Sequence, residues 1–203
     1  MTATPDGNAR LVRLSREEFR ARLPEALRLY VNAMRYPSST IEQRSPMWLT
    51  HALRDGWRCV AALDSDDTLL GIAYGYHGQP GQWWHDQVAR GLAGTIHEQD
   101  GRRRLSDCFE LTEIHVRPQS QAAGLGEQLI RTLLADLPEH HVLLSTPEGD
   151  TRAWRLYRRL GFVDVLRNYR FVGDHRPFAV LGRTLPLDAG RCGGQYAPAR
   201  HTR

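Results

Sequence analysis

The sequence predicts a mixed fold of α-helices and β-strands. Segments with apolar residues at helical spacing alternate with shorter, strand-like apolar segments. Two of the strand-like segments flank the turn-rich tetrapeptide 64–67, which predicts a β-hairpin. A loop containing two glycines joins a later strand to an amphipathic helix. These three observations favour helices packed on a sheet.

The bulk properties are those of an ordinary globular chain. It has 203 residues, of which 41% are hydrophobic and 25% charged, and this length fits one domain. We expect that domain to span 1–187, followed by a basic, flexible tail over 188–203 that is rich in Gly, Pro and Arg. No apolar run reaches about 18 residues, and the first ten residues lack the apolar core of a signal peptide. We therefore expect no membrane span and a cytoplasmic location.

Charge and cysteine content narrow the possible partners. The net charge is +4, the isoelectric point is about 9.2, and all 27 basic residues are arginines, for which the base composition of the genome is the simplest explanation. A mildly basic chain attracts anionic ligands. Nucleic acid is not an expected partner, because basic helices also carry acids and no recognition motif occurs. The three cysteines, Cys59, Cys108 and Cys192, are widely spaced, so we expect neither a disulfide framework nor a metal site.

The first half of the chain divides into clear segments. Arg10–Leu14 is strand-like, and Ser15 is a helix N-cap followed by acidic residues and an apolar stripe that runs to Met34. The remaining expected elements are a break at 36–39, a helix at 46–54, hairpin strands at 57–63 and 69–76, a helix at 83–92, and a solvated loop at 98–107.

The segment 109–116 is a strand with a change of face. Phe109 and Leu111 are apolar at odd positions, whereas Ile114 and Val116 are apolar at even positions. A strict period of two does not switch faces. A β-bulge near Thr112 or Glu113 would explain the switch, and a strand buried on both faces is the alternative.

The second half continues the alternation of helices and strands. Gly161 follows an apolar helix pattern and is a natural residue to terminate it. The expected elements are helices at 124–137 and 150–160, strands at 141–145, 162–165 and 170–172, and a last strand at 178–184.

The loop 118–126 has the features of an anion-binding site. Gly124 and Gly126 permit close approach of the backbone to a ligand, and the helix that follows begins with unpaired N–H groups. Such a terminus binds phosphate oxygens, and Gln121 offers a further donor. An ordinary strand-to-helix turn is the alternative. The loop lacks a Walker lysine and a complete GxGxxG pattern, which argues against nucleotide hydrolysis and dinucleotide binding.

Two motifs resemble those of the GNAT superfamily of N-acetyltransferases. One is the sequence Gln-Ala-Ala-Gly-Leu-Gly at 121–126, preceded by Ile-His-Val-Arg-Pro at 114–118; the other is 150–162, which ends in Tyr-Arg-Arg-Leu-Gly-Phe. Two residues depart from the family pattern: Asp150 replaces the usual Asn, and Gln121 replaces the commoner Arg. The resemblance implies acetyl-CoA, without a metal, bound by Ile114, His115, Val116, Gln121, Ala122, Ala123, Gly124, Leu125, Gly126 and Asp150.

The resemblance also implies a fold and a reaction. The fold would be a mixed, mostly antiparallel sheet flanked by helices, with a splayed strand pair and a β-bulge at the acyl-CoA site. The reaction would be direct attack of a primary amine on the thioester. Glu113, with Glu110 and His115 as rivals, would accept the amine proton, the Val116 N–H would stabilise the oxyanion, and Tyr157 would protonate the departing thiolate.

The acceptor side is less clearly marked. Tyr74, Tyr76 and Trp84 are aromatic residues in and after the hairpin, where they could line a pocket for a cationic amine or belong to the core. The acceptor would be a small-molecule or peptide amine, and similar proteins are commonly homodimers. A non-catalytic acyl-CoA-binding module on the same fold is the alternative function.

Overall fold

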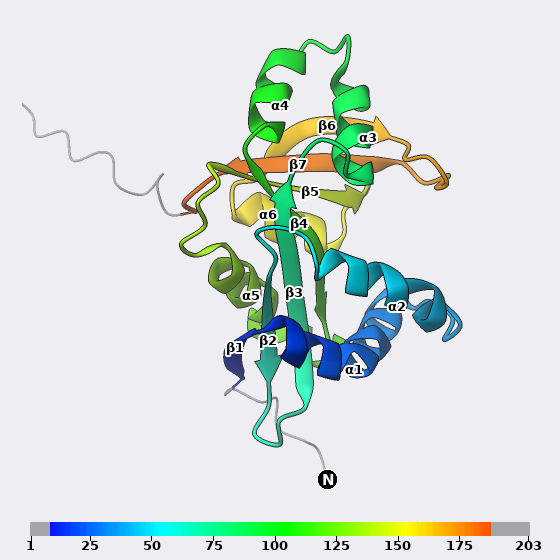
Figure 1. Cartoon of the computed structure of the whole chain (residues 1–203), viewed down its shortest axis with the longest axis vertical. Helices are drawn as coiled ribbons and strands as arrows, with labels where there is room; N and C mark the ends of the chain where they lie inside the picture. Colours follow the sequence, from blue (N-terminus) through cyan, green and yellow to red (C-terminus); the bar gives the residue numbers. More distant parts are fainter. Residues whose placement is uncertain (1–8, 188–203) are drawn as a thin grey trace, which may run out of the picture.

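A computed structural model of the chain describes residues 9–187. Seven strands form one sheet in the order β1-β2-β3-β4-β5-β7-β6, and every neighbouring pair is antiparallel except β4 and β5. In Figure 1, β2 and β3 run vertically, whereas β5, β6 and β7 run across them. The expected mixed, mostly antiparallel sheet flanked by helices is confirmed.

The elements of the described residues follow one another with short connections. In chain order they are β1 (Arg10–Leu14), α1 (Arg16–Met34), α2 (Thr40–His51), β2 (Arg58–Leu63), β3 (Leu69–Gly78), α3 (Trp83–Leu92), α4 (Glu98–Leu105), β4 (Cys108–Val116), the 3-10 helix η1 (Pro118–Ala123), α5 (Leu125–Leu134), β5 (His141–Pro147), α6 (Arg152–Arg159), β6 (Val163–Tyr169) and β7 (Phe178–Thr184).

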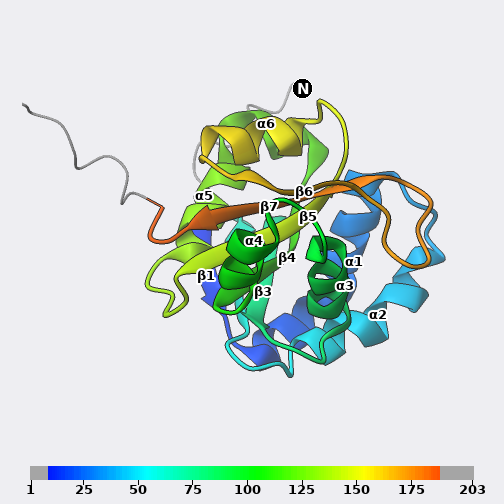
Figure 2. The same ribbon diagram turned by 90° about the horizontal axis from the view of Figure 1, so that it is seen from above.

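Helices cover both faces of the sheet. Figure 2 shows α5 and α6 on one side and α1 to α4 on the other. Leu129 and Ile130 of α5 are fully buried in a core with Tyr157 of α6, and we call this side of the sheet the α5–α6 face. On the opposite side, α1 and α2 pack over β2 and β3, and α3 and α4 pack over β5 to β7.

The best-predicted elements carry strong local signals. The N-cap Ser15 and Glu18 form a complete capping box, in which Ser15 Oγ accepts from the Glu18 N–H at 3.2 Å and Glu18 Oε2 accepts from the Ser15 N–H at 2.7 Å. The hairpin turn is also confirmed, because Asp64 Oδ1 accepts from the backbone N–H of Thr68 at 2.8 Å.

The C-terminal tail and Cys192 lie outside the described residues; Cys59 and Cys108 are buried free thiols.

Two expected segments were wrong. The second helix begins at Thr40 rather than at Pro46, which lies inside it. The expected loop 98–107 is largely the helix α4, which is held by the i,i+4 pairs Glu98–Arg102 at 2.8 Å and Asp100–Arg104 at 2.7 Å. Leu105 anchors this helix in the core, so its polar residues form a solvated helix face.

Smaller corrections concern the ends of elements in the second half. The helix expected at 124–137 covers Leu125–Leu134, and the one expected at 150–160 covers Arg152–Arg159. The strand piece expected at 162–165 extends through Tyr169, whereas 170–172 is not a strand. These residues lie in the connection to β7.

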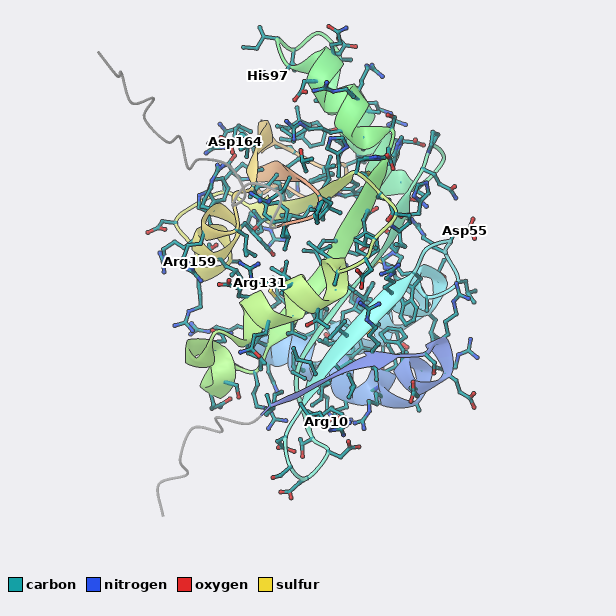
Figure 3. All side chains as sticks on the ribbon, turned by 90° about the vertical axis from the view of Figure 1, so that its left-hand side faces the viewer. Arg10, Asp55, His97, Arg131, Arg159 and Asp164 are labelled. Carbon is teal, nitrogen blue, oxygen red and sulfur yellow. The ribbon has the colours of Figure 1, made fainter. Side chains whose placement is uncertain are left out.

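Figure 3 shows the molecule from the side. Arg131 on α5 and Arg159 on α6 lie on the part of the molecule away from Asp55, which follows α2, and His97 marks the tip between α3 and α4. Within 9–187, no helix is both long and apolar enough to span a membrane. The same residues contain no group of three His, Cys, Asp or Glu side chains arranged to hold a metal ion.

Candidate active site at the divergence of two strands

The parallel strands β4 and β5 separate in the middle of the sheet. They pair only from Cys108 with His141 to Glu110 with Leu143. Beyond that point β4 continues to Val116 alongside β3, and β5 continues alongside β7. The expected splayed strand pair is therefore present, and it leaves one edge of β4 without a strand partner.

The ladder between β3 and β4 turns two peptide groups of β4 toward this opening. The Arg117 N–H donates to Leu70 O at 2.7 Å. Because alternate residues of an antiparallel strand bond to the same neighbour, the N–H groups of Ile114 and Val116 point away from β3 and toward β5. These are donors of the kind that can stabilise a developing oxyanion.

A β-bulge sits on β4 just before these peptide groups. Tyr74 pairs with Glu113, but the next residue, Gly75, pairs with Leu111, so Thr112 has no partner on β3. The expected bulge is confirmed, and it puts Glu110 and Glu113 on the same face of the sheet. The first part of β4, Cys108 to Leu111, is also buried on both faces.

The loop after β4 leads into α5 through two glycines. Gly124 caps the helix with a left-handed φ of 72°, and a Cβ there would meet no atom within 4 Å, so the backbone is open on that side. Gly126 lies in the first turn, where a Cβ would come within 3.1 Å of Leu156. The free N–H groups of the α5 terminus are thus accessible beside the opening between β4 and β5.

Two predicted cofactor-binding side chains already have partners within the chain. The amide nitrogen of Gln121 donates to Val116 O at 3.1 Å, which ties η1 to the end of β4 and leaves the amide a second N–H. Asp150 is 80% exposed and pairs with Arg155 at 2.7 Å. The N-cap of α6 is Thr151 rather than Asp150.

Glu113 and His115 form a close pair on β4. Glu113 Oε2 lies 2.6 Å from His115 Nε2, and the two side chains are 13% and 8% exposed. The His115 ring stacks on Trp48 and meets the edge of Tyr30 at a centroid distance of 4.8 Å. These contacts fix the imidazole, and through it the carboxylate of Glu113.

Glu110 occupies a more enclosed position before the bulge. It is 3% exposed, Oε1 accepts from the Tyr76 hydroxyl at 2.9 Å, and Oε2 has no partner. Burial raises the pKa of Glu110 to about 7, although the Tyr76 hydrogen bond and the nearby Arg54 guanidinium oppose the shift. The carboxyl therefore changes protonation near neutral pH.

Tyr157 approaches from the α5–α6 face. It lies in α6, is 5% exposed, and its ring packs against Phe162 at a centroid distance of 5.7 Å. Burial raises the pKa of this phenol, and the negative charge of Glu113 raises it further, so the hydroxyl keeps its proton at neutral pH.

The three predicted acceptor-side aromatics are separated into two places. Tyr74 and Tyr76 are buried beneath α1 and α2, and the Tyr74 hydroxyl lies 3.1 Å from His51 Nδ1. Trp84 packs in the α3–α4 core and donates from Nε1 to Ser145 Oγ on β5 at 3.1 Å. Trp84 therefore belongs to a different core cluster from the two tyrosines, on the same side of the sheet and over β5.

Sequence reasoning missed the contribution of α2. His51 and Trp48 lie on its inner face, and burial lowers the pKa of His51 to about 4, with Arg54 acting in the same direction. Their spacing of three residues places them on the same side of a helix. The helix expected at 46–54 already contains both residues, so their shared face was visible in the sequence.

Comparisons with known proteins agree on a family. The sequence model of the acetyltransferase (GNAT) family matches residues 23–162. A GCN5-like protein acetyltransferase of Mycobacterium tuberculosis is 48% identical over 202 residues, covering 87% of this chain and 98% of the relative.

Solved structures show the same fold at lower identity. A ribosomal-protein alanine N-acetyltransferase of Escherichia coli has a TM-score of 0.59 and 16% identity, covering 95% of this chain and 100% of its own. A spermidine N-acetyltransferase of Vibrio cholerae, solved as a dodecamer, has a TM-score of 0.58 and 16% identity, covering 93% and 100%.

Proposed function

This chain belongs to the GNAT family of acetyltransferases, and we propose that it transfers an acetyl group from acetyl-CoA to a primary amine of a protein. The observation that carries the proposal is the opening between β4 and β5. There, free backbone donors of Ile114 and Val116 lie beside the glycine-rich start of α5. A protein acceptor is favoured because the 48% identical relative is a protein acetyltransferase.

The residues at the opening fit acetyl-CoA. The α5 terminus, with its open backbone at Gly124, suits the pyrophosphate, and the free edge of β4 suits the amide-containing pantetheine arm. Bound there, acetyl-CoA supplies the acetyl thioester. Asp150 forms no part of this proposed contact, because its carboxylate is exposed and paired with Arg155.

The two proton transfers take place on opposite faces of the sheet, one at Glu113 and the other at Tyr157. Glu113, held by His115, accepts the proton that the attacking amine loses as its nitrogen bonds to the acetyl carbon. The Val116 N–H stabilises the negative charge that develops on the carbonyl oxygen. As the carbon–sulfur bond breaks, Tyr157 donates its proton to the sulfur.

Glu113 is preferred over its rivals because of its accessibility. It is 13% exposed, whereas Glu110 is 3% exposed and accepts a hydrogen bond from Tyr76. His115 already uses its Nε2 in the hydrogen bond with Glu113 Oε2. A carboxylate oriented by a histidine is suited to accept a proton directly or through one water molecule.

A CoA-release assay over protein, peptide and small-amine acceptors tests the proposal. We expect Tyr157→Phe and Glu113→Gln each to lower kcat by about 100-fold or more, with the KM for acetyl-CoA little changed. Tyr169→Phe is the matched control, because the Tyr169 hydroxyl donates to Gln87 O, away from the opening. Acetyl-CoA binding without transfer to any acceptor would instead favour a non-catalytic binding module.

A further inference from the structure

Arg44 occupies an unusual position on α2. The residues that share its helix face are Ile41, Trp48 and His51, and all of them pack inward toward α1 and the sheet. Arg44 itself is half-buried, with its guanidinium over the Tyr30 ring at 5.7 Å from the centroid. A charged group thus stands on a face that is otherwise apolar or neutral.

The guanidinium of Arg44 is poorly satisfied. Its one hydrogen bond among residues 9–187 runs to Met47 Sδ at 3.8 Å, and it makes no ion pair with any of them. A guanidinium has five N–H donors, and a thioether is a weak acceptor. Arg176, which approaches Tyr30 from the β6–β7 connection, differs: it pairs with Asp174 at 2.7 Å and donates to the Tyr36 hydroxyl at 3.1 Å.

Two ring contacts connect Arg44 to the proposed base. Tyr30, beneath the guanidinium, meets the edge of the His115 ring, and His115 bonds to Glu113. The unpaired cation therefore lies beside the acceptor side of the site. An extended peptide rises roughly 3.3 Å per residue, so a peptide whose amine lies at Glu113 needs only a few residues to reach Arg44.

Arg54 repeats this arrangement just beyond the other end of α2. Its guanidinium lies over the Tyr76 ring at 4.5 Å, and its Nη1 is buried without a hydrogen-bond partner. Arg54 forms no ion pair with any carboxylate of the described residues, Glu110 included, although its positive charge acts to lower the pKa of Glu110. Two unpaired arginines thus bracket His51 and Tyr74 on the acceptor side.

We propose that the acceptor is an acidic protein segment, in which an Asp or Glu side chain near the reactive amine binds Arg44. The proposal rests on the proposed function. A carboxylate matches the two parallel donors of a guanidinium, and the half-buried setting strengthens the pair relative to an exposed one. A polycationic acceptor is disfavoured, because Arg44 and Arg54 would repel it.

Paired peptides test this preference. Each peptide carries one acceptor amine. In one series this is the N-terminal amine of a peptide without lysine, and in the other it is a single lysine in a peptide with a blocked N-terminus. Within each series, one position no more than three residues from the amine is Glu, Gln or Arg. CoA release gives kcat and KM for the full chain, for Arg44→Gln, for Arg44→Lys, and for the control Arg28→Gln on the exposed face of α1.

At the best position, we expect the wild type to prefer Glu over Gln on the order of tenfold, mainly through KM. Arg44→Gln should reduce this preference to less than about twofold, Arg44→Lys should restore part of it, and Arg28→Gln should leave it unchanged. Equal rates for the Glu, Gln and Arg peptides, or faster rates for Arg, would overturn the inference.

The outcomes also separate this inference from the proposed function. Turnover of small amines but of no peptide would overturn the acidic acceptor and leave acetyl transfer standing. A preference for Glu that survives Arg44→Gln unchanged would overturn the role of Arg44. Absence of CoA release with every acceptor would overturn the proposed function itself.

Discussion

Replacing Glu110 with glutamine removes a carboxyl whose ionisation is opposed by the fold. Its ordinary pKa is 4.5, and burial raises it to about 7. As the pH rises through this interval, the unfolded chain releases the proton while the folded chain retains it, so stability falls. At about 1.4 kcal/mol per pH unit, the wild type loses about 2 to 3 kcal/mol between pH 5 and pH 8.

Glutamine keeps the shape of the side chain and an oxygen that accepts from Tyr76, but it does not ionise. Any cost of burying the amide is the same at both pH values and cancels in the comparison. Urea unfolding at pH 5 and pH 8 should therefore show the free energy of unfolding of Glu110→Gln rising by about 2 to 3 kcal/mol relative to the wild type. Glu42→Gln, exposed on α2, controls for the loss of one negative charge. If the stability of Glu110→Gln relative to the wild type were the same at pH 5 and pH 8, the reasoning would be refuted.

Three further predictions concern other parts of the site. Gly124→Val forces a β-branched residue into a left-handed φ of 72°, so we expect a loss of about 1 to 2 kcal/mol in urea unfolding and at least about tenfold weaker acetyl-CoA binding by calorimetry; normal binding would contradict the loop's role. Trp84→Phe removes the bond to Ser145 and should cost about 1 kcal/mol, and an unchanged urea midpoint would show that the bond contributes nothing. His51→Gln removes a buried base whose pKa is lowered to about 4 from 6.5; the wild type should lose stability as the pH falls from 6.5 to 4, whereas the variant should lose less, and parallel acid-denaturation curves would contradict this.

Local patterns predicted the parts of the fold that are determined locally. The change of apolar parity between Leu111 and Ile114 reflects the bulge directly, because each strand residue shows its face by its polarity. The capping box at Ser15 likewise predicted where α1 begins. The polar run at 98–107 was misread as a loop, although the i,i+4 pairs Glu98–Arg102 and Asp100–Arg104 in it are typical of a helix. The tertiary contact of Leu105, which the sequence does not show, buries one side of this helix.

The site was less predictable because it depends on which elements meet. The opening next to Val116 exists because β4 and β5 pair only as far as Glu110 and Leu143, and the apolar pattern of β4 alone does not show where β5 lies. The pairing of Tyr74 with His51 and of Glu110 with Tyr76 joins residues more than 20 positions apart. The family motifs led to the proposed cofactor loop, whereas the proposed acceptor side rests on the packing of α2.

A crystal structure of the chain with acetyl-CoA or CoA tests the central claim most directly. The account predicts the pyrophosphate within hydrogen-bond distance of the backbone N–H groups of 124–126 and the pantetheine arm along Ile114 and Val116. It also places the sulfur within reach of the Tyr157 hydroxyl and the thioester carbon on the side that Glu113 faces. CoA bound elsewhere, or a sulfur remote from both Tyr157 and the free edge of β4, would contradict it.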